Sequence, residues 1–417
     1  MYKQREHLFM NKPDIPEWGK SEKKYHIEIG YFQYNHEGER ICGDVFLSKR
    51  LPDENRVLCV LSDGMGHGVR ANVLATLTST ISLNFTIEHK NPSAIASILM
   101  KALPVCSERL ISYATYTIVD VSAANETVSI LEYDNPQTLV MRGKKIFSPE
   151  WEHVEYEGNE NDERKSNLKE CSFAPQIEDR IIFCSDGITQ SGLGKTYALG
   201  WGQEQYMEFV RETIDASPTI SASSLAERIV KQAYINDAHT PKDDMTCGVV
   251  YFREPRKTLL CTGPPFNSEK DHEFAAILND FSGKKIVSGA TTVDIIAREL
   301  GKEVIDEPIT DPALPQSSVM EGVDLVTEGV LTLTKVIGIL NKTNSNPNEI
   351  QKKGPAERVC DILLDSDEIY ILVGTKINVE HHDPELPVDI ELRKILIQRL
   401  ASVLSDKFMK VVNVKYM

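Results

Sequence analysis

Four acidic motifs that could do chemistry lie in the first 250 residues of the chain. They are Gly43-Asp44, Ser62-Asp63-Gly64, Ser185-Asp186-Gly187 and the pair Asp243-Asp244. Each Ser-Asp-Gly triplet directly follows a short apolar run, residues 56–61 and 180–184, which is typical of a buried strand. We therefore expect each of these aspartates to leave the end of a strand and to point into the crevice at the edge of a sheet.

The donor atoms in these motifs indicate which ion they could hold. Carboxylate and carbonyl oxygens are the ligands that Mg²⁺ and Mn²⁺ prefer, with waters completing the coordination. Zinc and iron fit poorly, because no histidine or cysteine cluster accompanies the aspartates. Asp-Gly is also a common turn dipeptide, so each motif taken alone fits an ordinary turn. Four such motifs beside strand patterns favour a shared metal site.

The elements around the motifs follow the order strands, helices, strands, helices, strand. A polar arm, residues 1–24, is expected to precede them. Strand patterns cover residues 26–34, 45–49, 56–61, 116–121, 128–132, 138–141, 180–184 and 247–252. Helical patterns cover residues 69–88, 92–110, 204–214 and 222–234. A charged stretch, residues 150–170, is expected to form an exposed loop.

A second domain is expected after a boundary at residues 253–257, where Pro255 lies. Helix and strand patterns alternate beyond it, with a strand at 285–288 and a helix at 325–340, so we expect a separate α/β domain. Gly289-Ala-Thr-Thr292 reads as a turn between strand and helix. Such a helix start could hold an anion such as phosphate, or Thr291 could simply cap the helix. The His381-His382-Asp383 cluster is expected in an exposed loop.

Taken together, the acidic motifs match a known family. The segments G-D-V-F, L-S-D-G-M-G-H-G-V-R-A, F-C-S-D-G-I-T and D-D-M-T-C-G-V-V resemble the metal-dependent, protein phosphatase 2C-like (PPM-type) serine/threonine phosphatases. The resemblance is specifically to the bacterial branch typified by stage II sporulation protein E, and it covers about residues 25–252. It implies an αββα sandwich, two sheets flanked by helix pairs, with a two-metal centre at one edge.

The resemblance also implies a role for each acidic residue. Asp63 corresponds to the carboxylate that bridges the two metals, and Gly64 supplies a backbone carbonyl to one of them. Asp186 and Asp243 correspond to ligands of the other metal. Asp44 would bind a metal directly or through water, and Asp244 would support the ligands rather than bind. Asp44, Asp63, Asp186 and Asp243 are thus the expected catalytic residues, holding two Mn²⁺ or Mg²⁺ ions.

Such a centre would aim a metal-activated water at a phosphoserine or phosphothreonine phosphorus, with no protein nucleophile. Eukaryotic relatives often carry a histidine after the Asp-Gly motif, where this chain has Met65. His67 is a candidate proton donor, although a solvent-facing or helix-capping histidine is the simpler interpretation. Arg40 could bind the substrate phosphate or be an ordinary exposed charge.

Composition limits the possible partners and the location. The 417 residues carry a net charge of −16, so nucleic acid and anionic membranes are not expected as partners. No apolar run approaches the roughly 18 to 20 residues of a membrane helix, and no signal peptide is visible, so we expect a cytoplasmic protein. The eight cysteines are scattered and are expected to be reduced core residues.

The sequence therefore predicts an α/β (α+β) protein with three parts: an arm at 1–24, a PPM-type phosphatase domain at 25–254, and a smaller C-terminal α/β domain at 255–417. The expected activity is metal-dependent hydrolysis of a phosphorylated regulatory protein, such as an anti-sigma-factor antagonist. The C-terminal domain is expected to be regulatory. Two alternatives remain open: a binding protein that keeps the phosphatase scaffold and acts through its C-terminal domain, and an enzyme that hydrolyses a small phosphate ester.

Overall fold

The computed structural model describes residues 25–88, 91–102, 114–155, 167–309, 311, 313–343, 354–376 and 388–417. The chain divides into two compact units, Tyr25–Glu254 (the first unit) and a second unit that includes Pro255–Met417. The arm at 1–24, the centre of the charged loop and the His381-His382-Asp383 cluster lie outside the described residues. The seven cysteines that are described are free and buried.

The first unit contains two antiparallel sheets. In spatial order, one consists of β1 (His26–Tyr34), β11 (Met245–Arg253), β10 (Asp179–Cys184), β6 (Leu139–Arg142) and β7 (Lys145–Phe147). The other consists of β2 (Asp44–Leu51), β3 (Arg56–Gly64), β4 (Ala114–Ser122), β5 (Thr127–Tyr133), β9 (Leu168–Phe173) and β8 (Glu152–His153).

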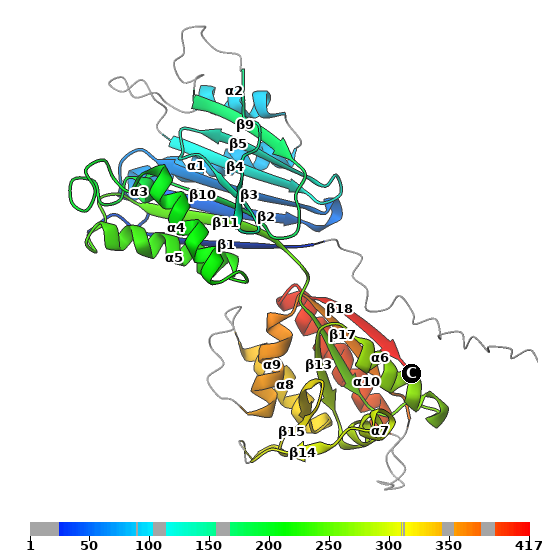
Figure 1. Cartoon of the computed structure of the whole chain (residues 1–417). Helices are drawn as coiled ribbons and strands as arrows, with labels where there is room; N and C mark the ends of the chain where they lie inside the picture. The colour runs from blue at the N-terminus through cyan, green and yellow to red at the C-terminus, as the bar shows by residue number, and fades with distance from the viewer. Residues whose placement is uncertain are drawn as a thin grey trace, which may run out of the picture. The chain divides into compact units, whose positions relative to one another are not determined.

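Helices cover the outer face of each sheet (Figure 1). These helices are α1 (Gly68–Ile87), α2 (Pro92–Ala102), α3 (Asp186–Thr189), α4 (Gly202–Ala216) and α5 (Ala222–Asn236). Side chains of α3, α4 and α5 form one core with β6, β10 and β11, while α1 and α2 pack on β3, β4 and β5. A third core lies between the two sheets. The predicted αββα sandwich is thus confirmed.

The layers explain why the apolar runs in the sequence are continuous rather than alternating. In β10, Ile181 and Phe183 face the other sheet, whereas Ile182 and Cys184 face the helices. Both faces of the strand are buried, so both sets of side chains are apolar. The aspartates that follow β10 and end β3 are therefore attached to rigid central strands.

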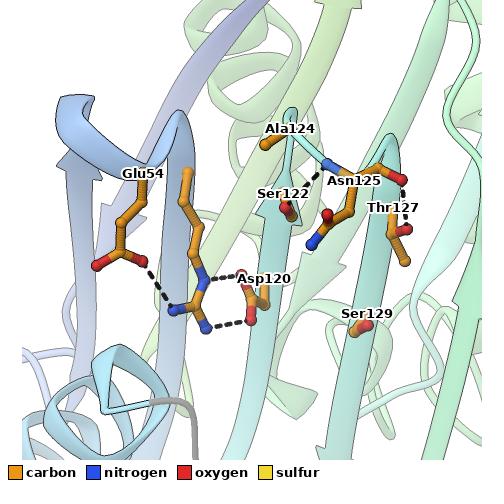
Figure 2. A pocket seen from close by; sticks show the side chains of 8 residues that line it. Glu54, Asp120, Ser122, Ala124, Asn125, Thr127 and Ser129 are labelled. Carbon is orange, nitrogen blue, oxygen red and sulfur yellow. Dashed lines mark hydrogen bonds and ion pairs between the residues drawn. The ribbon is translucent and has the colours of Figure 1, made fainter.

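Arg56 anchors the end of α1 to the start of β3, at the opposite end of this strand from Asp63. Its Nη2 donates to the Thr86 carbonyl at 2.7 Å, and its guanidinium makes a two-pronged ion pair with Asp120, at 2.6 and 2.8 Å. A hollow of about 340 Å³ lies beside this pair (Figure 2). It is lined by Glu54, Arg56, Asp120, Ser122, Ala124, Asn125, Thr127 and Ser129. Arg56 is 7% exposed and its donors are bonded within the protein, which indicates a structural role.

The second unit contains a mostly parallel sheet with helices on both faces. Its strand order is β14 (Val304–Asp306), β15 (Ser318–Met320), β16 (Val323–Thr327), β13 (Lys284–Ser288), β12 (Lys257–Thr262), β17 (Glu368–Val373) and β18 (Val411–Tyr416). The helices α6 (Asp271–Asp280) and α7 (Ala290–Leu300) cover one face. The other face is covered by α8 (Val330–Lys342), α9 (Pro355–Asp365) and α10 (Val388–Ser402).

One predicted element of the second unit is wrong. Residues 325–340 do not form a single helix, because Leu325 to Thr327 belong to β16 and α8 begins only at Val330. Glu328 and Gly329 separate the two elements, and the apolar residues on either side merged them into one pattern. Within the described ranges, no helix is long and apolar enough to cross a membrane.

Candidate metal centre

Asp44 and Asp63 lie directly opposite each other on neighbouring strands. Asp44 begins β2, Asp63 is the penultimate residue of β3, and the antiparallel register pairs the two. Opposed residues of such a pair project from the same face, with their Cβ atoms about 4.5–5.5 Å apart. Neither motif is a plain turn, since both aspartates belong to strands.

Asp186 and Asp243 join this pair from the other sheet. Asp186 is the first residue of α3 and follows the end of β10, and Asp243 lies just before β11. A Cβ atom added to Gly187 would lie 3.3 Å from Cβ of Asp243. Asp63 and Asp186 are within hydrogen-bonding reach of each other. The sandwich thus brings four distant parts of the sequence to one edge.

Glycines in three of the motifs allow this close approach. A Cβ on Gly43 would lie 2.6 Å from Oδ2 of Asp244, and one on Gly187 would lie 2.1 Å from the Asp244 carbonyl oxygen. A Cβ on Gly64 would lie 2.0 Å from the Ala71 carbonyl oxygen of α1. These distances exclude any side chain larger than hydrogen, so the glycines serve packing at the site.

The glycines of the following loop have a different role. Gly66 and Gly68 have φ angles of +94° and +69°, which shape the tight connection from β3 into α1. The run from Gly64 to Gly68 is therefore a tight strand-to-helix turn.

Ser185 holds Asp44 in place. Its hydroxyl donates to Oδ2 of Asp44 at 2.7 Å and accepts from the backbone N–H of Thr246 at 3.0 Å. Gln190 similarly donates from Nε2 to Oδ2 of Asp186 at 2.6 Å. Neither partner was predicted from the sequence. The Ser185 contact depends on how the two sheets meet, since the residues are 141 positions apart, whereas Gln190 follows Asp186 by four residues and its contact is local.

Several carboxylate oxygens of the cluster have no hydrogen-bond donor. Oδ1 of Asp44, Oδ1 of Asp186 and Oδ2 of Asp244 are buried and without a partner among the described residues. Asp44 and Asp244 are each 2% exposed, whereas Asp63, Asp186 and Asp243 are partly exposed. The cluster therefore has a buried floor and an open side, with lone pairs that need a cation or a proton.

Burial and mutual repulsion make these carboxyl groups hard to ionise. Burial raises the pKa of Asp63 well above its usual value, and the charges of Asp44, Asp186 and Asp243 raise it further. Burial also raises the pKa of Asp44 to about 7 and that of Asp243 to about 6. A divalent cation would remove this penalty by offsetting the negative charge.

The cluster fits hard divalent cations by its donor chemistry. The side-chain atoms that could coordinate an ion are all carboxylate oxygens. Three of these oxygens lack a hydrogen-bond partner among the described residues. Within the described part of the chain, no group of three or more Asp, Glu, His or Cys side chains is already gathered in an arrangement that could hold one ion. Small side-chain rotations, with water and backbone oxygens as further donors, would have to complete any coordination shell.

Two histidines lie at the rim of the cluster. The His67 ring stacks on the His36 ring at 4.3 Å, and its Nδ1 lies 2.8 Å from Oε1 of Glu39. The backbone N–H of His36 donates to Oδ1 of Asp244 at 2.9 Å. His67 makes no capping bond to α1 and is largely exposed. Arg40 is exposed in the loop between β1 and β2.

Residues 53–253 match the model of one protein family, Stage II sporulation protein E (SpoIIE). Among curated proteins, the phosphoserine phosphatase RsbX of Bacillus subtilis (strain 168) is 34% identical to this chain over 67 residues. That stretch is 16% of this chain and spans only a third (33%) of RsbX.

Solved structures similar to this chain include two phosphatases. One is the PP2C phosphatase domain of SpoIIE from Bacillus subtilis with a fragment of its regulatory domain. It is 18% identical to this chain, with a TM-score of 0.46, and the match covers 56% of this chain and 65% of that chain. RsbX in complex with magnesium is 17% identical with a TM-score of 0.37, over 56% of this chain and 98% of that chain. The match to the family model agrees with the resemblance read from the acidic motifs.

Proposed function

We propose, on the basis of the SpoIIE family domain at residues 53–253, that the first unit is a metal-dependent phosphoprotein phosphatase acting on phosphoserine or phosphothreonine. The observation that carries the proposal is the aspartate cluster. Asp44, Asp63, Asp186 and Asp243 come from four separate segments and meet at one sheet edge. Among the described residues, one oxygen of Asp44 and one of Asp186 have no hydrogen-bond partner. A scaffold kept only for binding would not need this set of closely placed acidic groups, whose mutual repulsion is costly.

Each residue of the cluster has an assigned part in this proposal. Asp63 would bind both ions of a pair of Mn²⁺ or Mg²⁺ ions. The Gly64 carbonyl and Asp44 would hold one of these ions, and Asp186 and Asp243 would hold the other. When bound, the ions would lower the pKa of a water and neutralise phosphate oxygens. Ser185 and Gln190 fix the rotamers of Asp44 and Asp186, and the buried Asp244 supports the floor. The open side, where Asp63, Asp186 and Asp243 are partly exposed, would admit the phosphate group.

The substrate we propose is a phosphorylated regulatory protein, with a small phosphate ester as the alternative. The second unit has its own hydrophobic cores and none of the four acidic motifs. We therefore assign it a regulatory part rather than a part in the chemistry, within a domain division at 25–254 and 255–417.

Metal removal and return test the activity. We expect the full-length protein to release phosphate from a phosphoserine peptide with Mn²⁺ or Mg²⁺, and to lose this activity in EDTA. Activity should return when excess Mn²⁺ is added. Parallel assays with p-nitrophenyl phosphate separate the two substrate classes by kcat/KM. The proposal would be contradicted if neither substrate released phosphate, with Mn²⁺ or with Mg²⁺.

Binding of Mn²⁺ should strengthen as the pH rises. In the metal-free protein, Asp44 has a pKa of about 7 and the pKa of Asp63 is raised well above its usual value, so protons compete with the cation at low pH. A carboxyl of pKa near 7 changes its ionised fraction about tenfold between pH 6 and 8, and affinity should follow. Calorimetry in two buffers of different ionisation enthalpy should detect proton release at pH 6. Equal dissociation constants at both pH values would count against the cluster as the site.

A further inference from the structure

Two helices of the second unit begin side by side at the carboxyl edge of its sheet. Gly289 follows β13 and precedes α7, and Gly329 follows β16 and precedes α8. The two loops are joined by hydrogen bonds from the Gly289 N–H to the Thr327 carbonyl and from the Ser288 hydroxyl to the Glu328 carbonyl, both at 2.9 Å. A Cβ on Gly329 would lie 3.4 Å from Cα of Gly289. The starts of α7 and α8 are thus neighbours.

Neither helix start is capped by a side chain. The N-cap residues are Gly289 and Gly329, which have no side-chain donor or acceptor. The interpretation of Thr291 as the cap is wrong, because Thr291 is the second residue of α7. The N–H groups of the first turn of a helix have no partner within it, and they carry the positive end of the helix dipole. Two sets of such donors meet here.

A buried hydroxyl group without a hydrogen-bond partner in the described part of the chain lies in the first turn of α8. Thr332, in the first turn of α8, is 0% exposed, and its Oγ1 has no hydrogen-bond partner among the described residues. Helical side chains lean toward the N-terminus, so the Thr332 side chain leans toward the start of α8. Thr334, two residues further along α8, is exposed, and its hydroxyl donates to the Val330 carbonyl at 2.7 Å. Thr292, 1% exposed in α7, has its Oγ1 3.4 Å from the place of a Cβ on Gly289.

The topology agrees with a ligand at this edge. In doubly wound sheets, ligands bind outside the carboxyl ends of the parallel strands. The position between β12 and β17 is filled by the chain itself, because a Cβ on Gly374 would lie 2.1 Å from the Pro264 carbonyl oxygen. Beside β13 and β16, by contrast, Gly289 and Gly329 are only half-buried.

We propose that the α7–α8 site, formed by the starts of these helices with Thr292 and Thr332, binds a phosphate group, either free phosphate or a phosphate monoester. The groups that converge there are N–H and O–H donors, which suit an anion and not a cation. The glycines leave room for the anion to approach the backbone. All residues of this site belong to the second unit, and the proposal does not depend on phosphatase activity.

The test uses the full-length protein in EDTA, so that no metal in the first unit can bind phosphate. Calorimetry with inorganic phosphate is compared with sulfate and chloride at equal ionic strength. Thr332→Val keeps the shape of the side chain and removes the hydroxyl, and the matched control is Thr334→Val. We expect Thr332→Val to weaken phosphate binding about tenfold or more, as for a lost hydrogen bond to a charged group, with the control unchanged. In phosphate-free buffer, Thr332→Val should raise Tm, since it removes an unsatisfied hydroxyl.

A second variant and a second ligand sharpen the test. Gly329→Ala places a methyl group between the helix starts, where it meets Gly289 at an ordinary contact distance, and should abolish binding in a folded protein. Titration with glycerol phosphate separates the sources: binding of both ligands indicates a monoester site, and binding of phosphate alone a free-phosphate site. Absence of phosphate-specific heat in the unmodified protein, or unchanged affinity in Thr332→Val and Gly329→Ala, would overturn the proposal.

Discussion

Replacing Asp63 with asparagine should reduce phosphate release by at least about 100-fold while the first unit stays folded. Asp63 lies opposite Asp44 and within reach of Asp186, so it is the carboxylate in contact with both halves of the cluster. Asparagine has nearly the same shape but lacks the negative charge. The loss should therefore concern cation binding and not the packing of β3.

The thermal stability of Asp63→Asn separates these two effects. Removing one of several repelling carboxylates should leave Tm in EDTA unchanged or higher, while the rise in Tm on adding Mn²⁺ should largely disappear. Asp53→Asn, at an exposed position before β3, is the matched control and should retain activity and the Mn²⁺ effect. Turnover of Asp63→Asn above about a tenth of normal would refute the assignment of Asp63 as the bridging ligand.

The apolar runs located the central strands of the first unit because these strands are buried on both faces, whereas the αββα layers were implied by the family resemblance. Residues 56–61 and 180–184 are continuous apolar runs, and such runs followed by Ser-Asp-Gly locate the ends of β3 and β10. The second unit was harder to predict. Residues 257–262 begin at the last residue of the expected boundary, 253–257, and no element was predicted for them. They form β12, the strand from which the sheet extends in both directions.

The aspartates could be predicted, but the way they are held could not. Their types and neighbours are local features of the sequence, so Asp44, Asp63, Asp186 and Asp243 stand out. The hydrogen bond from Ser185 to Asp44 joins residues 141 positions apart, and it exists only because the two sheets meet at that edge. The roles of these residues in metal binding remain predictions, which the variants above test.

A buried carboxyl group away from the cluster gives a pH dependence of a different kind. Glu132 in β5 is 3% exposed, and its Oε2 accepts from the backbone N–H of Thr138 at 2.9 Å and from the Thr138 hydroxyl at 2.7 Å. Thr138 immediately precedes β6 of the other sheet, so this contact joins the two sheets. Burial raises the pKa of Glu132 to about 7, although the bonds from Thr138 oppose the shift.

Glu132→Gln should therefore remove a loss of stability that occurs as the pH rises. The pKa in the folded state, about 7, exceeds the usual 4.5, so the folded state holds a proton that the unfolded state releases between these values. The stability contributed by that proton is full below about pH 4.5 and is lost as the pH rises through 7. Over this window the unmodified protein should lose about 3 kcal/mol of unfolding free energy that the glutamine variant does not lose.

The measurement follows urea unfolding of the first unit between pH 5 and 8.5 through the fluorescence of Trp151 and Trp201. A buried amide lowers the stability of Glu132→Gln by a similar amount at every pH, so the informative quantity is the change of the difference with pH. Relative to the unmodified protein, the variant should gain stability steadily up to about pH 7 and no further. The exposed Glu152→Gln should show no such trend. A pH-independent difference for Glu132→Gln would mean that Glu132 is ionised in the folded protein throughout, with Thr138 supplying enough stabilisation to offset its burial.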